Sequence, residues 1–408
     1  MSEVMNIPQL RFPEFGGEWK ENKLGDIATF SKGKGISKSD IDNDGQLECI
    51  RYGELYTTYN ELIKDIHSKT NVSKENVKLS QIGDVIIPAS GETAIDIATA
   101  SCVLKDGVAI GGDLNIIRSN IDGVFNAYYL NNKNKNSVAR LSQGSSVIHL
   151  YPKHLEILKL NLPAKPEQQK IATFLTAVDT KIEQLSKKQE LLGEYKKGAM
   201  QQIFSQAIRF KADDGSDFPD WEEKKLGGIG SFYRGHSYNS TNVKGSGLLV
   251  LRSSNIKNDS LVLDNDLQFV NKDCSDNISL KTNDIVICMA NGSKRLVGKS
   301  GFYHGNYNGK LTVGAFCSIF RTDNLLSKYI LQTIQYRKYL HILLAGTNIN
   351  NLKNSELSEL KFNLPVSSFE QTKIANFLSS IDNKIEQVGK QLDESKQFKK
   401  ALLQQMFV

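Results

Sequence analysis

Two stretches of this sequence are near copies of each other, and they decide the fold. The first is EQQKIATFL at residues 167–175, and the second is EQTKIANFL at residues 370–378. The copies lie 203 residues apart in a chain of 408 residues. Self-similarity at a fixed distance is the signature of a repeated structural unit. The sequence therefore predicts two related halves.

The similarity extends outward from these stretches. WKENKLGDI at residues 19–27 matches WEEKKLGGI at residues 221–229, and these two segments hold both tryptophans of the chain. The tripeptide NLP precedes each near copy, at residues 161–163 and 363–365. Between these ends only a hydrophobic pattern is shared. The order is thus a variable unit, a repeated helix, a second variable unit and a second repeated helix.

Each near copy opens a long amphipathic helix. No proline interrupts residues 167–204, and apolar side chains recur at alternating steps of four and three residues. This spacing is an a/d seam, typical of helices that pack along one another. A helix of about 38 residues is roughly 57 Å long, and its apolar stripe needs a partner. The seam residues expected to pair the helices are Ile171, Leu175, Val178, Ile182, Leu185 and Leu192, with Ile374, Leu378, Ile381, Ile385, Val388 and Leu392.

The alternative is that each helix folds back on its own variable unit. The strict seam and the matched lengths favour a shared coiled coil. Within the variable units, short apolar runs bounded by Gly, Asn and Asp predict strands at residues 84–87, 114–117, 248–251 and 285–288. Residues 125–130 and 328–340 are expected to be helical. The predicted fold class is α+β, with two globular α/β units and two long paired helices.

Composition is that of an ordinary globular protein. Hydrophobic residues make up 39% and charged residues 24%, which excludes collagen-like and wholly disordered chains. No run reaches the about 18 apolar residues of a membrane-spanning helix, and residues 1–15 lack the pattern of a secretory signal. The 5 cysteines show no CxxC spacing, which favours reduced thiols. We therefore expect a cytoplasmic protein with no membrane partner.

The net charge of +6 is compatible with nucleic-acid binding without demanding it. A basic surface would have to come from the segregation of charges on the folded chain, because 51 lysines and arginines nearly balance 45 aspartates and glutamates. Net charge alone therefore assigns no partner, so a partner has to be inferred from the polar loops.

Several motifs begin like catalytic or metal sites but lack an essential part. DIDNDG at residues 40–45 opens like a calcium loop, yet Arg51 stands where the loop needs its bidentate glutamate. Residues 219–224 contain the letters of a nuclease motif, but its two halves abut instead of coming from separate strands. His149 and His154 have no third ligand nearby. We expect no catalytic, cofactor-binding or metal-binding residue in this chain.

The remaining polar loops suit the reading of DNA. Arg, Lys, Asn, Gln, Ser and Thr side chains contact base edges and phosphates, and both variable units carry Gly-rich loops of these residues at corresponding places. Solvated surface turns are the alternative, and recurrence in both units favours binding. The candidates in the first unit are Lys32, Lys34, Arg51, Tyr52, Ser90, Thr93, Ser145, Ser146 and His149. Those in the second are Arg234, Arg252, Ser253, Asn255, Asn291, Ser293, Lys294, Arg295, Thr347, Asn348 and Asn350.

On these motifs the whole chain resembles the specificity (S) subunits of type I restriction–modification systems. RFPEF at residues 11–15 leads into the first WKENKLG, and FPDW at residues 218–221 leads into the second copy. NLP followed by EQQKIA or EQTKIA completes the resemblance in both halves. In the second copy VSSF at residues 366–369 replaces AKP at residues 164–166, which shifts the expected helix start by one residue.

The resemblance implies an organisation in four parts. Residues 1–160 and 207–362 would be two target recognition domains, and residues 161–206 and 363–408 would be two conserved helical regions. The helices would pair antiparallel, so that the two halves form an internal repeat with a pseudo-twofold axis. The matching symmetry of DNA half-sites agrees with this arrangement.

The resemblance also implies a function. Each domain would read one half of a bipartite, asymmetric site in double-stranded DNA, and the paired helices would set the spacer. Two methyltransferase (M) subunits would dock on the helices, restriction (R) subunits would join them, and adenine methylation and restriction would follow. S-adenosylmethionine, ATP and Mg would belong to those partners, and this chain would be non-catalytic. The alternatives are a stand-alone nucleic-acid-modifying enzyme and a coiled-coil scaffold without a DNA role.

Overall fold

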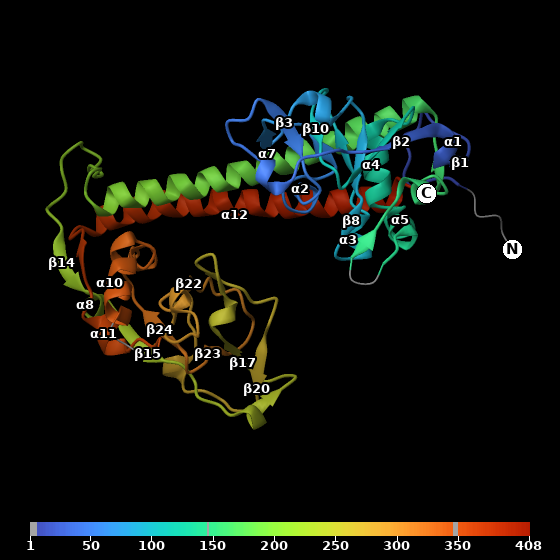
Figure 1. Cartoon of the computed structure of the whole chain (residues 1–408). Helices are drawn as coiled ribbons and strands as arrows, with labels where there is room; N and C mark the ends of the chain where they lie inside the picture. Colours follow the sequence, from blue (N-terminus) through green and yellow to red (C-terminus); the bar gives the residue numbers. More distant parts are fainter. Residues whose placement is uncertain (1–5, 145–146, 346–349) are drawn as a thin grey trace. The chain divides into compact units, whose positions relative to one another are not determined.

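The computed structural model describes residues 6–144, 147–345 and 350–408, and the chain forms two compact units. Unit 1 comprises Met1–Lys187 and Gly389–Val408, and unit 2 comprises Lys188–Val388. Each unit contains one α/β domain and one half of each long helix, α7 (Lys165–Phe204) and α12 (Ser368–Gln405) (Figure 1). The NLP copies lie 202 residues apart and the helix starts 203, so the expected one-residue shift is confirmed.

The domain of unit 1 is built on two sheets. The first has the strand order β2-β11-β7-β9-β4, and the second has the order β5-β3-β10-β6, with β3 and β10 parallel. The strands predicted at residues 84–87 and 114–117 are confirmed as β7 and β11. The strand bounds are β2 (Ala28–Lys32), β3 (Leu47–Ile50), β4 (Leu62–Ile63), β5 (Ser68–Thr70), β6 (Lys78–Leu79), β7 (Val85–Pro88), β9 (Ser101–Val103), β10 (Ala109–Ile110) and β11 (Leu114–Ser119).

Short elements complete this domain. A two-stranded ladder of β1 and β13 leads into α7, and a second ladder joins β8 to β12. The helix predicted at residues 125–130 is confirmed as α4. The bounds are β1 (Lys20–Lys23), α1 (Leu24–Ile27), α2 (Glu54–Thr57), β8 (Ser90–Gly91), α3 (Ala94–Ile97), α4 (Gly123–Asn131), α5 (Lys135–Leu141), β12 (Ile148–His149), α6 (Pro152–Leu155) and β13 (Lys159–Leu162).

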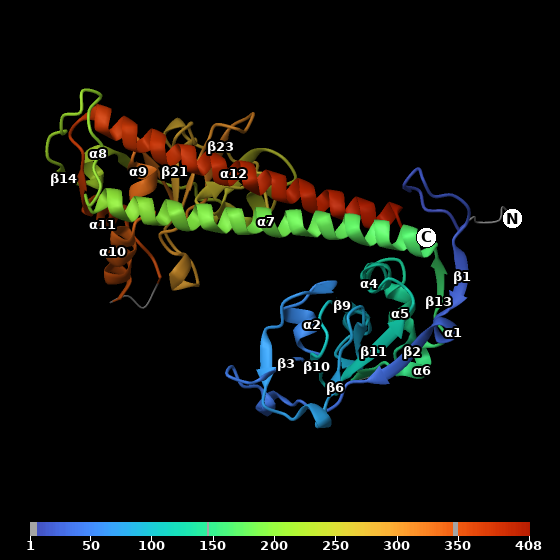
Figure 2. The same cartoon turned by 90° about the horizontal axis from the view of Figure 1, so that it is seen from above.

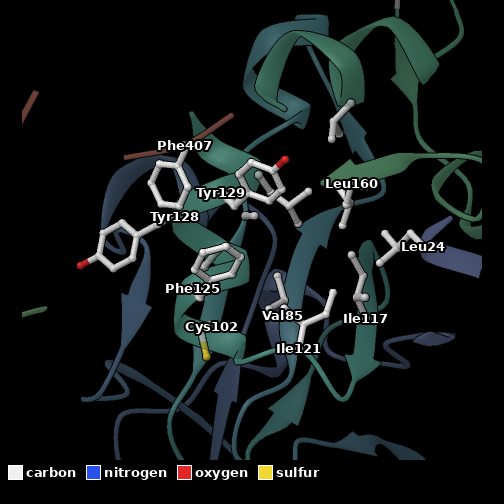
Figure 3. Packing of buried hydrophobic residues seen from close by; sticks show 14 of the residues in the cluster. Leu24, Val85, Cys102, Ile117, Ile121, Phe125, Tyr128, Tyr129, Leu160 and Phe407 are labelled. Atoms are coloured by element: carbon white, nitrogen blue, oxygen red, sulfur yellow. The ribbon is translucent and has the colours of Figure 1, made fainter. Parts of the chain in front are cut away.

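An aromatic cluster fixes the domain of unit 1 to its helix halves. Phe125 and Tyr129 of α4 gather around Phe407, which follows α12 in the chain (Figure 3). The rings of Tyr129 and Phe407 stack with centroids 5.4 Å apart, and Trp19 meets Phe407 edge-on at 6.4 Å. Burying such large rings stabilises the joint between domain and helices.

The domain of unit 2 repeats this plan with a larger first sheet. Its strand orders are β15-β24-β21-β22-β19-β18 and β16-β20-β17-β23, and β17 and β23 are parallel as β3 and β10 are. The strands predicted at residues 248–251 and 285–288 are confirmed as β17 and β21. Trp221 packs edge-on against Phe204, the last residue of α7, at 6.3 Å.

The bounds of the second domain follow the same order along the chain. They are β14 (Glu222–Lys225), α8 (Leu226–Ile229), β15 (Ser231–Arg234), β16 (Val243–Lys244), β17 (Leu248–Leu251), β18 (Ile256–Lys257), β19 (Ser260–Leu261), β20 (Gln268–Val270), β21 (Ile285–Cys288), β22 (Ser300–Phe302), β23 (Leu311–Val313), β24 (Cys317–Arg321), α9 (Ser327–Ile330), α10 (Ile334–Ala345), α11 (Asn354–Ser358) and β25 (Lys361–Leu364). A ladder of β14 and β25 leads into α12, as β1 and β13 lead into α7.

One predicted helix is broken. The sequence predicts a single helix over residues 328–340, whereas the structure has α9 and then α10. Thr333 lies at the break, and its hydroxyl accepts a hydrogen bond from the Tyr336 N–H at 3.2 Å. A threonine in this position caps a new helix and ends the previous one. The expectation of a single helix was therefore wrong. The break could not be predicted because the apolar pattern continues across it.

The two long helices run antiparallel in both units. In unit 1 Asp179 of α7 pairs with Lys399 of α12 at 2.8 Å, and in unit 2 Lys196 pairs with Asp382 at 2.7 Å. Lys196 lies 17 residues after Asp179, and Asp382 lies 17 residues before Lys399, so both units share one register. Figures 1 and 2, which are two perpendicular views, both show the helices side by side.

The predicted seam is covered along both helices. In unit 1 Ile171 and Leu175 share a core with Leu402 of α12, and in unit 2 Ile374 and Leu378 share one with α7. Buried seam residues are Ile171, Leu175, Leu185, Ile374, Leu378, Ile381, Val388 and Leu392, and half-buried ones are Val178, Ile182, Leu192 and Ile385. The paired helices of the predicted fold class are therefore confirmed.

Candidate nucleic-acid interface

The repeated motif of unit 1 builds an internal joint. The carboxylate of Glu167 is 2% exposed, accepts a hydrogen bond from Nε1 of Trp19 at 3.3 Å and pairs with Arg11 at 2.7 Å. Hydrogen bonding to this carboxylate raises the pKa of Arg11. The next residue, Gln168, donates to the carbonyl oxygen of Pro163 at 2.9 Å. These motif residues are thus used inside the protein.

Unit 2 repeats the joint with the corresponding residues. The buried carboxylate of Glu370 accepts from Nε1 of Trp221 at 3.1 Å and pairs with Arg209 at 3.1 Å. Gln371 donates to the carbonyl oxygen of Pro365 at 2.7 Å. The most strongly repeated residues therefore connect each domain to its helix, and the binding surfaces have to lie elsewhere.

The polar loops of unit 1 meet where the strands of its first sheet end, on one side of the sheet. β2 and β7 flank β11 antiparallel, so that β2 and β7 end where β11 begins. The Gly33 N–H donates to the Leu114 carbonyl at 2.8 Å, and the Lys34 N–H donates to the Ile110 carbonyl at 2.9 Å. We call this surface the unit 1 loop edge, and it comprises residues 32–38, 51–56, 89–93, 111–113 and 147–153.

The same backbone bonds form the unit 2 loop edge. The Gly235 N–H donates to the Cys317 carbonyl at 3.0 Å, and the His236 N–H donates to the Val313 carbonyl at 2.6 Å. Its strands β15, β24 and β21 are arranged as β2, β11 and β7 are. The unit 2 loop edge comprises residues 234–238, 252–255, 289–295, 314–316 and 350–351.

Glycine is required where each loop crosses the parallel strand pair. A Cβ on Gly33 would lie 2.0 Å from the carbonyl oxygen of Gly111, and one on Gly235 would lie 2.2 Å from that of Gly314. Backbone atoms cannot give way at such distances, so only glycine lets the two segments approach. This requirement explains Gly33 and Gly235 without any ligand.

The unit 1 loop edge gathers several predicted side chains. Arg51 follows β3, its guanidinium lies 3.8 Å from Glu54, and that carboxylate also accepts from the Arg51 N–H. Tyr52 is exposed and meets the exposed Tyr56 edge-on at 6.4 Å. The Tyr56 hydroxyl donates to the Ser90 carbonyl at 3.3 Å. Arg51, Tyr52 and Ser90 are therefore neighbours, as a shared surface requires.

A second group on this edge is basic and aromatic. His149 stacks on Tyr151 with centroids 5.9 Å apart, and the Lys32 ammonium lies 5.2 Å from the same ring. Lys153 approaches that ring at 5.9 Å. Cations beside exposed aromatic faces suit contact with nucleic-acid phosphates and bases.

Other predicted residues of unit 1 have different surroundings. Lys34 is exposed on the same loop. Thr93 caps α3, because its hydroxyl accepts from the Asp96 N–H at 3.1 Å. Ser145 and Ser146 lie outside the described residues.

The unit 2 loop edge brings together Ser253, Asn291 and Asn350. The Asn291 amide donates to the Ser253 hydroxyl at 3.2 Å, and the Asn350 amide donates to the carbonyl next to Asn291 at 3.1 Å. Arg252 is held by the carboxylate of Asp266. Hydrogen bonding from Ser254 and the nearby Arg252 charge lower the pKa of Asp266. These amides and hydroxyls have the donors and acceptors that base edges need.

The outer part of the unit 2 loop edge is basic. Arg234 is exposed at the end of β15, and Lys294 and Arg295 are exposed on the loop after β21, beside the exposed Ser293. Exposed cations of this kind hold phosphates. Thr347 and Asn348 lie outside the described residues.

Asn255 is a correction. The sequence predicts that it faces DNA, but it is 1% exposed. Its carbonyl accepts from the Arg252 N–H at 2.9 Å, and its amide donates to the Asn265 and Asp266 carbonyls at 3.1 and 3.3 Å. A side chain with both ends occupied inside the domain holds a turn and leaves nothing for a base.

Several aromatic and buried residues of these edges were not predicted from the sequence, because a polar, Gly-rich pattern does not mark them. Tyr56 and Tyr151 belong to the unit 1 loop edge, and Phe316, which is 71% exposed, belongs to the unit 2 loop edge. His236 takes the backbone place of Lys34, yet it is 7% exposed, and burial lowers its pKa. In the described part of the chain its Nε2 has no hydrogen-bond partner.

Within residues 6–144, 147–345 and 350–408, no group of three His, Cys, Asp or Glu side chains is placed to hold a metal ion. All five cysteines are buried, and burial raises the pKa of Cys49 to about 11 and that of Cys102 to about 12. Nor does any described helix have the length and apolarity to cross a membrane. The fold thus defines a tandem of two related α/β domains on paired helices.

Comparison with known proteins identifies the family. The description "Type I restriction modification DNA specificity domain" matches residues 16–192 and again residues 219–395. The chain belongs to this family, which confirms the resemblance read from the repeated motifs.

Individual relatives agree with the family. The MjaVIII specificity subunit of a type I restriction enzyme from Methanocaldococcus jannaschii is 26% identical over 414 residues, which cover 97% of this chain and 92% of that one. The StySPI specificity subunit from Salmonella potsdam is 32% identical over 169 residues, 38% of this chain and 35% of that one. The crystal structure of the S subunit from M. genitalium matches with a TM-score of 0.66 and 16% identity, over 98% of this chain and 99% of that one, so the fold is shared.

Proposed function

We propose that this chain is the non-catalytic DNA-recognition subunit of a type I restriction–modification complex. The observation that carries the proposal is the pair of loop edges, which have the same backbone bonds but different side chains. Two equal scaffolds with unequal surfaces suit the reading of two different half-sites by related domains. The target is therefore a bipartite, asymmetric site in double-stranded DNA.

The paired helices would set the spacer between the half-sites. α7 has 40 residues and α12 has 38. At about 1.5 Å per residue each is roughly 60 Å long, which bounds the separation at roughly 17 base pairs. We propose that two M subunits dock on the helices and that R subunits join them. S-adenosylmethionine, ATP and Mg are then bound by those partners.

Mapping of adenine methylation across the genome tests the proposal. Cells that contain the chain should methylate one bipartite motif, and deletion of the chain should abolish methylation at that motif alone. An unchanged methylation map after deletion would contradict the proposed role.

A second experiment tests the non-catalytic assignment. The purified chain, incubated with motif DNA, S-adenosylmethionine, ATP and Mg, should neither methylate nor cut, and addition of the M subunits should restore methylation. Methylation or cleavage by the chain alone would favour the stand-alone enzyme. Absence of any DNA preference in the assembled complex would favour the scaffold.

A third experiment tests the spacer. Insertion of one heptad into α7, matched by one in α12 at the antiparallel position, keeps the seam in register. The methylated motif should then acquire a longer spacer with both halves unchanged, or methylation should be lost. A motif with its original spacer would contradict the role of the helices.

A further inference from the structure

Equivalent backbone positions in the two loop edges carry chemically different side chains, a carboxylate in unit 1 and a phenyl ring in unit 2. In unit 1 the Ala89 N–H donates to the carbonyl oxygen of Asp113 at 2.8 Å, and in unit 2 the Met289 N–H donates to that of Phe316 at 2.8 Å. Both residues precede the strand at the centre of the edge, β11 or β24. Asp113 and Phe316 are therefore equivalent by structure.

The neighbouring bonds extend this equivalence. Ala89 accepts from the Leu150 N–H at 3.0 Å, and Met289 accepts from the Leu352 N–H at 2.8 Å. These bonds tie each position to the β7–β11 or β21–β24 ladder. The two side chains are therefore presented from the same part of the same scaffold.

The backbone of Phe316 is hydrogen-bonded while its ring faces solvent. Its carbonyl also accepts from the Ala290 N–H at 3.2 Å, and the Cys317 N–H donates to the Gly314 carbonyl at 2.8 Å. The side chain is nevertheless 71% exposed. Single exposed apolar residues are common, so exposure alone assigns nothing. The position itself is informative, because it lies within the polar loop edge and is occupied by a carboxylate in the other unit.

We propose that this position selects a base in each half-site, and that Phe316 contacts the C5-methyl group of a thymine. The proposal rests on the proposed function. A phenyl ring has no donor or acceptor, and the thymine methyl is the apolar group that base pairs present in the major groove. A carboxylate at Asp113 instead accepts from the amino group of cytosine. The two positions thus distinguish the half-sites by chemistry.

Uracil tests this contact because it differs from thymine only in lacking the methyl group. The complex of this chain with its M subunits is bound to duplexes carrying the methylated motif, and each thymine of one half-site is replaced in turn by uracil. For the wild type, one replacement should weaken binding about 3- to 10-fold, the size expected from the burial of one methyl group and part of the ring. F316A should weaken binding to thymine DNA by a similar factor.

The combination of the two changes is decisive. In the F316A complex the same uracil should have no further effect, because both changes remove one contact. Effects that multiply independently, or an F316A complex that binds as the wild type does, would overturn the proposal. A unit 2 half-site without any A·T pair would also overturn it.

Matched variants isolate the position from general effects. I342A removes a similarly exposed apolar side chain (69%) from α10 of unit 2, outside the loop edge and the long helices, and its binding should be unchanged. F316L keeps an apolar side chain and should keep the sensitivity to uracil. D113A should alter preference only in the other half-site. If the wild-type complex shows no preference for the motif, the proposed function fails; if it does and F316A keeps the uracil effect, only this inference fails.

Discussion

Asp84 of unit 1 and Asp284 of unit 2 are buried, and each pairs at 2.7 Å with an arginine of β11 or β24, Arg118 or Arg321. Each pair raises the pKa of its arginine through the hydrogen bond to the aspartate. At the loop edges the equivalence of side chains ends. The comparison teaches that the repeat preserves residues that hold each domain together and varies those that face outward.

A second comparison concerns how each domain meets the helix pair. In unit 1 Lys399 of α12 bonds to Asp179 at 2.8 Å and to Glu61 of the domain at 3.3 Å, and the Tyr128 hydroxyl donates to Asp179 at 2.5 Å. Burial opposes the charge of Lys399, but the attraction of Glu61 and Asp179 is larger, so the pKa of Lys399 is raised. One ammonium group thus bonds both to the partner helix and to the domain.

Unit 2 has an equivalent lysine–aspartate pair between the long helices, with different neighbours. Lys196 bonds to Asp382 at 2.7 Å and to Gln332 at 2.9 Å, and the Tyr329 hydroxyl donates to Asp382 at 3.0 Å. Asp259, which precedes β19 as Glu61 precedes β4, lines a cleft of about 1110 Å³ between the domain and the helix halves of this unit. Burial raises the pKa of Asp259. Asp382 is also paired with Lys328 of α9 at 3.9 Å, so this carboxylate keeps a cation of the domain when Lys196 is removed.

Loss of the buried carboxylate of Glu167 or Glu370 should have the largest effect on stability, and the effect should be equal in the two units. E167A and E370A each remove a buried carboxylate and leave a half-buried arginine and an indole N–H without their acceptor, which should lower the free energy of unfolding by about 3–5 kcal/mol. Because each unit has one of the 2 tryptophans, W221F and W19F backgrounds let urea unfolding followed by fluorescence report one unit at a time. E394A on the exposed face of α12 should change little. Losses no larger than that of E394A would remove the joint from the account.

Loss of the lysine that bonds to the aspartate on the partner helix, Lys399 in unit 1 or Lys196 in unit 2, should lower the free energy of unfolding less, and by different amounts in the two units. K399M leaves two carboxylates facing each other and should cost about 2–3 kcal/mol, whereas K196M should cost less. The folded pKa of Lys399 is raised above its ordinary value of 10.5, so its stabilisation is present below pH 10.5 and is lost as the pH rises through the folded pKa. Urea unfolding below and above pH 10.5 should show the difference between K399M and the wild type shrinking. Equal losses in K399M and K196M would contradict the comparison.

The loop edges should affect DNA affinity and leave stability unchanged. R51A and R252A should each weaken binding of the assembled complex by about 1–3 kcal/mol, and each should affect only its own half-site. If an arginine contacts phosphate, the salt dependence should also fall by about one ion. K105A, which removes a cation from the opposite end of the first sheet, is the control. Binding measured at several salt concentrations checks this, and an effect of K105A equal to that of R51A would contradict the assignment.

The smallest effect should come from the surface ion pairs of the lead-in ladders. Lys159 pairs with Glu21 at 2.8 Å, and Lys361 pairs with Glu223 at 2.7 Å, with all four side chains at least half exposed. Exposed pairs gain little, because water and salt screen them. K159A and K361A should leave the unfolding midpoint unchanged in both units. A loss comparable to that of K399M would show that these ladders contribute more than exposure allows.

The helices and strands were open to prediction because their signals are local. A seam at steps of four and three residues is visible in Ile171, Leu175 and Val178 without knowledge of what covers them. The break at Thr333 was hidden, because a threonine cap competes with an unbroken apolar pattern and the sequence does not say which dominates.

The candidate site was predictable as loops but not as side chains. Asn255 and Asn291 stand in similar polar segments, yet the first is buried in a turn and the second reaches the edge. Tertiary contacts decide that difference, and they are not visible in single letters. Phe316 was missed for the converse reason, since an apolar residue between two strand signals is expected to be buried.

Exchange of one domain tests the central claim most directly. Residues 1–160 are replaced by the corresponding residues of a relative that directs methylation to another motif, and adenine methylation is mapped across the genome. The account predicts a hybrid motif with one half from the donor, and with the other half and the spacer unchanged. A motif altered in both halves, or in neither, would contradict the claim that each unit reads its own half-site.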